Sequence, residues 1–345
     1  MTTIWRFNRD NPWMLTLLQV TRLNNPGVRI FVVCDAEVFK GYPELALRLA
    51  QLRVDVRVRE SYMWKDSPTV RVLRNLPSWY NHEDESLYAT TRHCALYSEA
   101  VRSGVKRIVL MDADVGLFSP VWDFTSPFDE DVVSGCRHTI QFVIIKTWAL
   151  GNFCAFLANY YHKNETELRA DARFLGKRED EFNNFHDMEF MSLFLHYTPP
   201  SVVSRRVLCP EQPDMPVCST TYSGCRASSQ VQALESFFKV KFNQAEAQGE
   251  FTVCSNLSSF HEIVEWGSDS RGLPVPVHRR TGECFPAIHF QGDCKRFIPS
   301  FLDHYKRIVR EALTAGPGDG GGGAPGSGRR RRRLASWESA FLDEE

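Results

Sequence analysis

The sequence has no apolar run near the roughly 18 residues that cross a membrane, so no membrane span is expected in its 345 residues. It also lacks an excess of charge. The formal net charge of −1 argues against the broad basic surface that binds nucleic acid. No C-x-x-C pair occurs, so a structural zinc site is not expected. The composition, 43% apolar and 24% charged, is that of a soluble globular protein with a sizeable core.

The N-terminal segment MTTIWRFNRDNPW lacks the apolar core and the small-residue cleavage site of a signal peptide. Six of the ten cysteines lie in the polar region 209–294 and would suit disulfides in an oxidising lumen, as would sequons at Asn164 and Asn256. We expect either a cytoplasmic protein or a Golgi or endoplasmic-reticulum enzyme with an upstream anchor outside this chain. The other four cysteines are expected to be buried free thiols: Cys34, Cys94, Cys136 and Cys154.

Strands alternate with helices along the first half of the chain. This order predicts an α/β fold with a mostly parallel central sheet and helices on both faces. A structured domain is expected over 1–314, followed by a disordered Gly- and Arg-rich tail over 315–345. Helices are expected over 10–22, 43–52, 84–103 and 299–313, and strands over 28–35, 54–58, 107–111 and 287–290.

The segment IVLMDADVGLFSP brings Asp112 and Asp114 to the end of an apolar strand. Ligands of such sheets bind at the carboxyl ends of strands, and Asp35 is expected to lie at another such end. Two carboxylates one residue apart repel each other unless a cation lies nearby. Mn²⁺ or Mg²⁺ takes carboxylate ligands together with substrate phosphates, so the pair predicts a metal site. A surface turn capped by Asp112 is the alternative.

This D-x-D after a buried strand resembles the metal-binding element of the GT-A class of nucleotide-sugar glycosyltransferases. A second segment, AIHFQGDCKRF, contains the pattern H-x-x-G-x-x-K at His289, Gly292 and Lys295. It resembles the C-terminal motif of the glycogenin-like and lipopolysaccharide glycosyltransferases, the family 8-like group. The resemblance implies that His289 completes the metal site with Asp112 and Asp114. It also implies that Gly292 and Lys295 hold the donor diphosphate.

The same resemblance implies a GT-A fold over 1–314 and transfer of a sugar, with retention, from a UDP-linked donor. The acceptor hydroxyl would belong to a glycan, a protein or a lipid. Arg92 would lie near the nucleotide, or it is a surface helix arginine. Asp187 would face the sugar or the acceptor, or it caps a helix. Gln141 would contact the sugar, because the stretch IQFVIIK lacks the glycine that relatives carry there.

Two other functions fit parts of the sequence. A haloacid-dehalogenase-like phosphatase also has D-x-D after an apolar strand and would use Asp112 as its nucleophile. Its motif usually opens the domain, however, and it favours Thr or Val where this chain has Gly116. A catalytically degenerate sugar-binding protein of the same fold is the non-enzymatic alternative.

Overall fold

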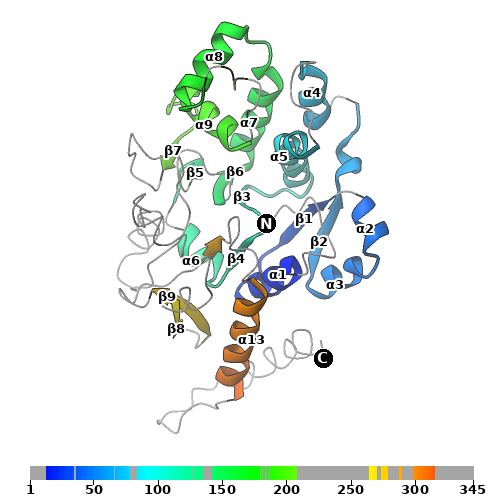
Figure 1. Ribbon diagram of the computed structural model, residues 1–345, viewed down its shortest axis with the longest axis vertical. Coiled ribbons are helices and arrows are strands. Elements are labelled where there is room, and N and C mark those ends of the chain that lie inside the picture. Colours follow the sequence, from blue (N-terminus) through cyan, green and yellow to red (C-terminus); the bar gives the residue numbers. More distant parts are fainter. Residues whose placement is uncertain are drawn as a thin grey trace.

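A computed structural model of the chain describes residues 13–34, 36–65, 67–77, 84–126, 128–134, 142–178, 180, 182, 185, 187–207, 264–269, 273–278, 287–289 and 298–314. Its helices and strands form a mixed α/β fold (Figure 1). The tail over 315–345 and the end of the first expected strand at Asp35 lie outside these residues. The division into a domain over 1–314 and a tail therefore stays a prediction. Within the described part of the chain, no helix is long and apolar enough to span a bilayer.

Every helix and strand expected from the sequence is present, with ends that differ by a few residues. The helices are α1 (Trp13–Asn24), α2 (Glu37–Gly41), α3 (Leu45–Gln51), the 3-10 helix η1 (Arg59–Tyr62), α4 (Pro68–Asn75), α5 (Asp84–Arg102), α6 (Val121–Thr125), α7 (Thr147–Tyr160), α8 (Glu165–Phe174), α9 (Asp187–Tyr197) and α13 (Ile298–Thr314). The strands are β1 (Ile30–Cys34), β2 (Val54–Val58), β3 (Arg107–Met111), β4 (Val115–Leu117), β5 (Val132–Ser134), β6 (Phe142–Lys146), β7 (Arg205–Val207), β8 (Val264–Ser268), β9 (Pro274–His278) and β10 (Ala287–His289).

The expectation of a mostly parallel sheet is wrong for the described strands. Strands β1 and β2 pair in parallel, as do β5 and β7. The central sheet, in the order β3-β6-β5-β7, contains antiparallel pairs on both sides of β6, and the pairs β4–β10 and β8–β9 are also antiparallel. The connection from β5 to β6, residues 135–141, is too short for the crossover that a parallel pair needs.

The central sheet is buried on both faces, as the sequence predicts. Along β6, Phe142 and Ile144 belong to the apolar cluster that includes residues of α1, α3 and α13. The alternate residues Val143 and Ile145 belong to the cluster formed with α5, α7 and α9. Because successive side chains of a strand point to opposite faces, helices cover the two sides of this sheet. The apolar sequence of β6 follows from this double burial.

Helix α1 holds β4, the strand that follows the D-x-D segment. Figure 1 shows α1 beside β4, with α13 next to it. Asn25 at the end of α1 donates to the carbonyl oxygens of Thr21 and Ser119, and its side-chain oxygen accepts from the backbone N–H of Val121 at 2.6 Å. Asn24 donates in the same way to the carbonyl oxygen of Leu117. The buried side-chain amides of Asn24 and Asn25 therefore fix the backbone at the end of β4 and in the residues that follow it.

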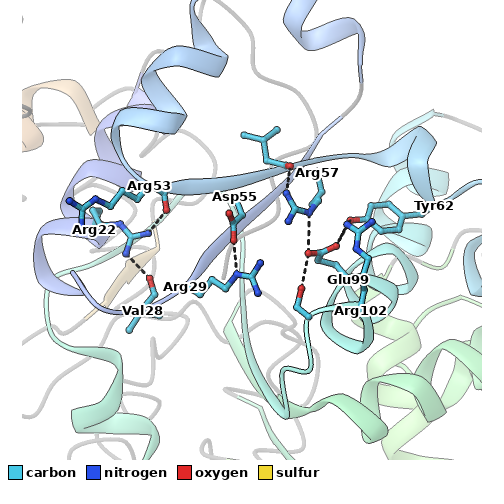
Figure 2. A network of polar contacts seen from close by, with 11 residues as sticks. Arg22, Val28, Arg29, Arg53, Asp55, Arg57, Tyr62, Glu99 and Arg102 are labelled. Atoms are coloured by element: carbon cyan, nitrogen blue, oxygen red, sulfur yellow. Dashed lines mark hydrogen bonds and ion pairs between the residues drawn. The ribbon is translucent and has the colours of Figure 1, made fainter.

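Buried Arg22 joins α1 to the β1–β2 unit (Figure 2). Its guanidinium donates to the carbonyl oxygens of Leu52 and Arg53, each at 2.8 Å, and also to that of Val28. Arg53 has a left-handed backbone, with φ of 52°, which costs free energy for a residue that has a Cβ atom. The contact with Arg22 stabilises this turn between α3 and β2.

Glu99 fixes the C-terminal part of α5 in a second polar cluster (Figure 2). Its fully buried carboxylate pairs with Arg57 at 3.0 Å and with Arg102, and it accepts hydrogen bonds from Tyr62 at 3.1 Å and Ser103 at 2.8 Å. Burial would raise the pKa of Glu99, but the hydrogen bonds and the Arg57 charge outweigh it and lower that pKa. The cluster anchors α5 to β2 and η1.

Three of the cysteines expected to be buried free thiols are confirmed as such: Cys34, Cys94 and Cys154. Cys136 and the six cysteines between 209 and 294 lie outside the described residues. The sequon asparagine Asn164 caps α8, since its side-chain oxygen accepts from the backbone N–H of Glu167 at 3.0 Å. The compartment of the protein therefore stays open.

We predict that Asn25→Ala lowers the free energy of unfolding by about 2–3 kcal/mol, because it leaves a buried N–H and a buried carbonyl without their partner. Urea denaturation measures this loss. The control is Leu47→Ala, since Leu47 is 64% exposed and its removal should change stability by less than about 0.5 kcal/mol. Equal stabilities of the two variants would contradict the role given to Asn25.

Candidate functional site

The D-x-D segment forms the tight turn between β3 and β4. Strand β3 ends at Met111, and the backbone N–H of Val115 donates to the carbonyl oxygen of Asp112 at 3.2 Å. The Asp114 residue is buried, with 7% exposed, whereas 24% of the Asp112 side chain is exposed. The two carboxylates thus lie just after the carboxyl end of a buried strand, as the sequence predicts. They belong to the turn that follows the strand.

Arg92 supplies a cation beside the first aspartate. It projects from α5, and its Nη1 lies 2.9 Å from Oδ1 of Asp112. Its Nη2 forms an ion pair with Asp187, the first residue of α9. Burial would lower the pKa of Arg92, but the two carboxylates outweigh it and raise that pKa, so the guanidinium stays charged. The alternative of a surface helix arginine is therefore wrong, because 13% of this side chain is exposed.

Asp187 is an ionised buried carboxylate. It is 5% exposed and lies at the N-terminus of α9, where the helix dipole favours negative charge. Burial would raise its pKa, but the Arg92 charge and the His93 hydrogen bond outweigh this and lower that pKa. Asp187 thus contacts both Arg92 and His93 of α5.

His93 belongs to this network and was not expected from the sequence. Its Nε2 lies 3.1 Å from Oδ2 of Asp187, and its ring packs edge-on against Phe153 with a centroid separation of 5.7 Å. Burial lowers the pKa of His93, so the imidazole is neutral at neutral pH. The same nitrogen lies 3.3 Å from Nε of Arg92, so His93 contacts both members of the Arg92–Asp187 ion pair. No local pattern could have revealed this contact, because Asp187 lies far away in the sequence.

The two motif segments meet through backbone pairing. Strand β10 pairs with β4 in antiparallel register, with Ala287 opposite Leu117 and His289 opposite Val115. Val115 directly follows Asp114 in the chain, so His289 is carried to the edge of the D-x-D turn. Gly292, Lys295 and Gln141 lie outside the described residues, and their predicted roles stay predictions.

The D-x-D turn offers two candidate metal ligands among the described side chains, Asp112 and Asp114. Two carboxylates on one turn supply the hard oxygen donors that Mn²⁺ or Mg²⁺ prefers, and an imidazole from β10 would suit Mn²⁺. Among the side chains that the structure describes, no group of three His, Cys, Asp or Glu residues is placed to hold a metal. Arg92 supplies one positive charge beside Asp112, and it shares that charge with Asp187. The two carboxylates are ligands of the type that a divalent cation takes.

Comparison with known proteins identifies no family. No family model matches the chain, and no curated protein matches its sequence. Among solved structures, the apo crystal structure of mouse xyloside xylosyltransferase 1 aligns over 70% of this chain and 93% of that chain. The aligned sequences are 10% identical, and the TM-score is 0.37. At this identity and TM-score the similarity carries no information about substrate or mechanism.

We predict that Arg92→Met lowers the free energy of unfolding by about 3 kcal/mol, because it leaves the buried Asp187 and the half-buried Asp112 without their cation. Chemical denaturation at neutral pH measures the loss. The control is Arg29→Met, which breaks the exposed 2.6 Å ion pair with Asp55 and should cost less than about 1 kcal/mol. Similar losses in both variants would contradict a buried role for Arg92.

We predict that the protein loses stability as the pH falls below about 6.5, the usual pKa of an unfolded histidine. The lowered pKa of buried His93 means that the unfolded chain takes up more protons than the folded one in this window, so stability falls with pH. His93→Gln should flatten the dependence, measured as melting temperature between about pH 5 and pH 8. His162→Gln, at an exposed position, is the control. An unchanged pH profile in His93→Gln would rule out this contribution.

Proposed function

We propose that this protein is a glycosyltransferase of the GT-A fold that transfers a sugar from a nucleotide sugar, most simply a UDP-sugar, to an acceptor hydroxyl. The observation that carries the proposal is the pairing of β10 with β4, which brings His289 next to the D-x-D turn. Segments that resemble the two donor-binding motifs of the glycogenin-like group are far apart in the sequence. Their backbones lie side by side in the fold, as one donor site would need.

The residues divide into three tasks in this proposal. Asp112, Asp114 and His289 would hold Mn²⁺ or Mg²⁺, and a metal bound there would neutralise charge on the departing diphosphate. Gly292 would let the backbone approach the diphosphate closely, and Lys295 would supply a point charge to its oxygens. Gln141 would contact the sugar. Retention at the anomeric carbon is part of the proposal and follows from the family resemblance alone.

Arg92 would orient the first metal ligand. Its guanidinium holds Asp112 from one side and Asp187 from the other, so the Asp112 carboxylate has one preferred direction. This preorganisation would lower the cost of assembling the metal site, because the ligand does not have to be ordered on binding. Placed beside the first aspartate, Arg92 also adds positive charge near the expected nucleotide phosphates.

Asp187 would act by positioning, and a role as general base is disfavoured. A carboxylate with a lowered pKa is a weak base. Its described contacts go to Arg92 and His93, so its effect on the reaction would pass through Arg92 to Asp112. In this proposal Asp187 acts on the donor site as a positioning residue.

We predict that Asp114→Asn abolishes Mn²⁺-dependent stabilisation by UDP-sugars. A ligand at about 100 times its Kd stabilises the folded state by about 2.7 kcal/mol, a shift that thermal melting resolves easily. The control is Asp129→Asn, because the Asp129 side chain is fully exposed on a loop. Urea denaturation without metal checks that the near-isosteric substitution leaves the fold intact.

Each outcome of this experiment has a distinct meaning. Retained stabilisation and sugar transfer in Asp114→Asn would overturn the proposal. Stabilisation of the parent protein without any turnover over a panel of acceptors would favour a degenerate sugar-binding protein. A phospho-aspartate trapped at Asp112 after incubation with a phosphate ester would favour the phosphatase alternative.

A further inference from the structure

An open groove lies between α4 and α7, with Tyr97 of α5 contributing to its wall. Its volume is about 670 Å³, within the range of about 300–1,000 Å³ that is usual for small-molecule sites. The residues that line it include none of Arg92, His93, Asp112 and Asp187. Among the described residues, the groove is therefore separate from the candidate donor site.

The groove favours an anion. Arg71 and Arg74 lie three residues apart on α4, so their guanidinium groups project from the same face of that helix, and both are exposed. The lining residues include no Asp or Glu. Two planar guanidinium groups can bind carboxylate or sulfate oxygens in pairs of parallel hydrogen bonds. The charge of this wall is thus complementary to a ligand with acidic groups.

The opposite wall suits a sugar ring. Trp148, Asn152 and Asn159 lie along one exposed face of α7. They are four and seven residues apart, which corresponds to about one and two helical turns. Trp148 is 46% exposed, so part of its broad indole surface is open to a ligand. An aromatic face packs against the apolar C–H face of a pyranose, while the amides of the asparagines can pair with hydroxyl groups.

Gly151 shapes the groove between these walls. A Cβ atom at this position would lie 2.8–3.0 Å from the ring of Tyr97, so any side chain here would displace the tyrosine. The Nδ2 atom of Asn75 also donates to the carbonyl oxygen of Ala158, which ties the end of α4 to α7. The spacing of the two walls is therefore set by packing within the protein.

We propose that this groove binds an acidic saccharide, with Arg71 and Arg74 on its carboxylate or sulfate groups and Trp148 against a sugar ring. A nucleotide is less favoured, because phosphates bind well to backbone N–H groups at helix N-termini, and the N-terminus of α4 in this groove begins with Pro68, which has no N–H. The choice of a saccharide rests on the proposed function, while the preference for an anion rests on the groove alone. An acidic acceptor chain would then be held at a second point away from the transfer site.

Direct binding tests this proposal without donor or metal, so its failure is distinguishable from failure of the proposed function. Isothermal titration would use three tetrasaccharides: unsulfated chondroitin, sulfated chondroitin and neutral cellotetraose. The first two distinguish carboxylate from sulfate as the recognised group. We expect at least one acidic chain to bind and cellotetraose to bind about tenfold more weakly or not at all. UMP serves as a competitor.

Variants assign the binding to the groove. Arg71→Glu with Arg74→Glu should weaken binding by more than about tenfold, and Trp148→Ala by about tenfold. Arg71→Lys with Arg74→Lys keeps the charge and should retain part of the affinity. The charge-matched control is Lys40→Glu with Arg178→Glu, two exposed cations that do not line the groove, and it should bind like the parent. Melting temperatures confirm that each variant is folded.

Three results would overturn the proposal. They are the absence of binding by both acidic chains, equal binding of cellotetraose, and equal losses in the groove variant and the charge-matched control. Displacement of the bound saccharide by UMP, with UMP binding lost in Trp148→Ala, would instead identify a nucleotide site. Acidic-chain binding that is lost only in the groove variants would support the proposal, whatever the result for Asp114→Asn.

Discussion

The ion pairs of Arg92 with Asp112 and Asp187 connect three parts of the chain that the sequence keeps far apart. Arg92 comes from α5, Asp112 from the end of β3 and Asp187 from the start of α9. A buried guanidinium is stable only with carboxylates beside it, and the buried carboxylate of Asp187 in turn needs the guanidinium. The mutual requirement fixes the middle of α5 and the start of α9 relative to the D-x-D turn.

The same turn is held from its other side by backbone and amide contacts. Strand β10 pairs with β4 immediately after Asp114. Asn24 at the end of α1 and the next residue, Asn25, bind the backbone at the end of β4 and just beyond it. Hydrogen bonds from neutral amides position the backbone without adding charge. The electrostatic balance of the turn therefore depends on Arg92, while its location depends on β4.

Helix α5 serves two regions with different chemistry. Arg92 and His93 project toward the D-x-D turn, whereas Tyr97 lies in the wall of the α4–α7 groove. The Glu99 cluster anchors the end of the helix to β2 and η1. Because Arg92, Tyr97 and Glu99 all lie on this one helix, a disturbance of its packing would affect both the candidate site and the groove.

The sequence by itself determined the local structure of this protein. Buried strands such as β1 and β3, the helix α5 that stops before Gly104 with its φ of 64°, and the amphipathic α13 all follow from periodicity and local sterics. It also determined the position of Asp112 and Asp114 after a strand, because that depends on neighbours in the chain.

Only the tertiary structure decided the direction of strand pairing, the cation beside Asp112 and the place of His93. It also decided that Arg71, Arg74 and Trp148 face a common groove. The alternation of helices and strands predicted a parallel sheet, yet β6 pairs in antiparallel direction with both β3 and β5, and only the connection from β5 is short. A single helical position cannot reveal a partner such as Asp187 that folding brings from another element. Contacts of this kind depend on how the elements pack, and packing is a property of the whole chain.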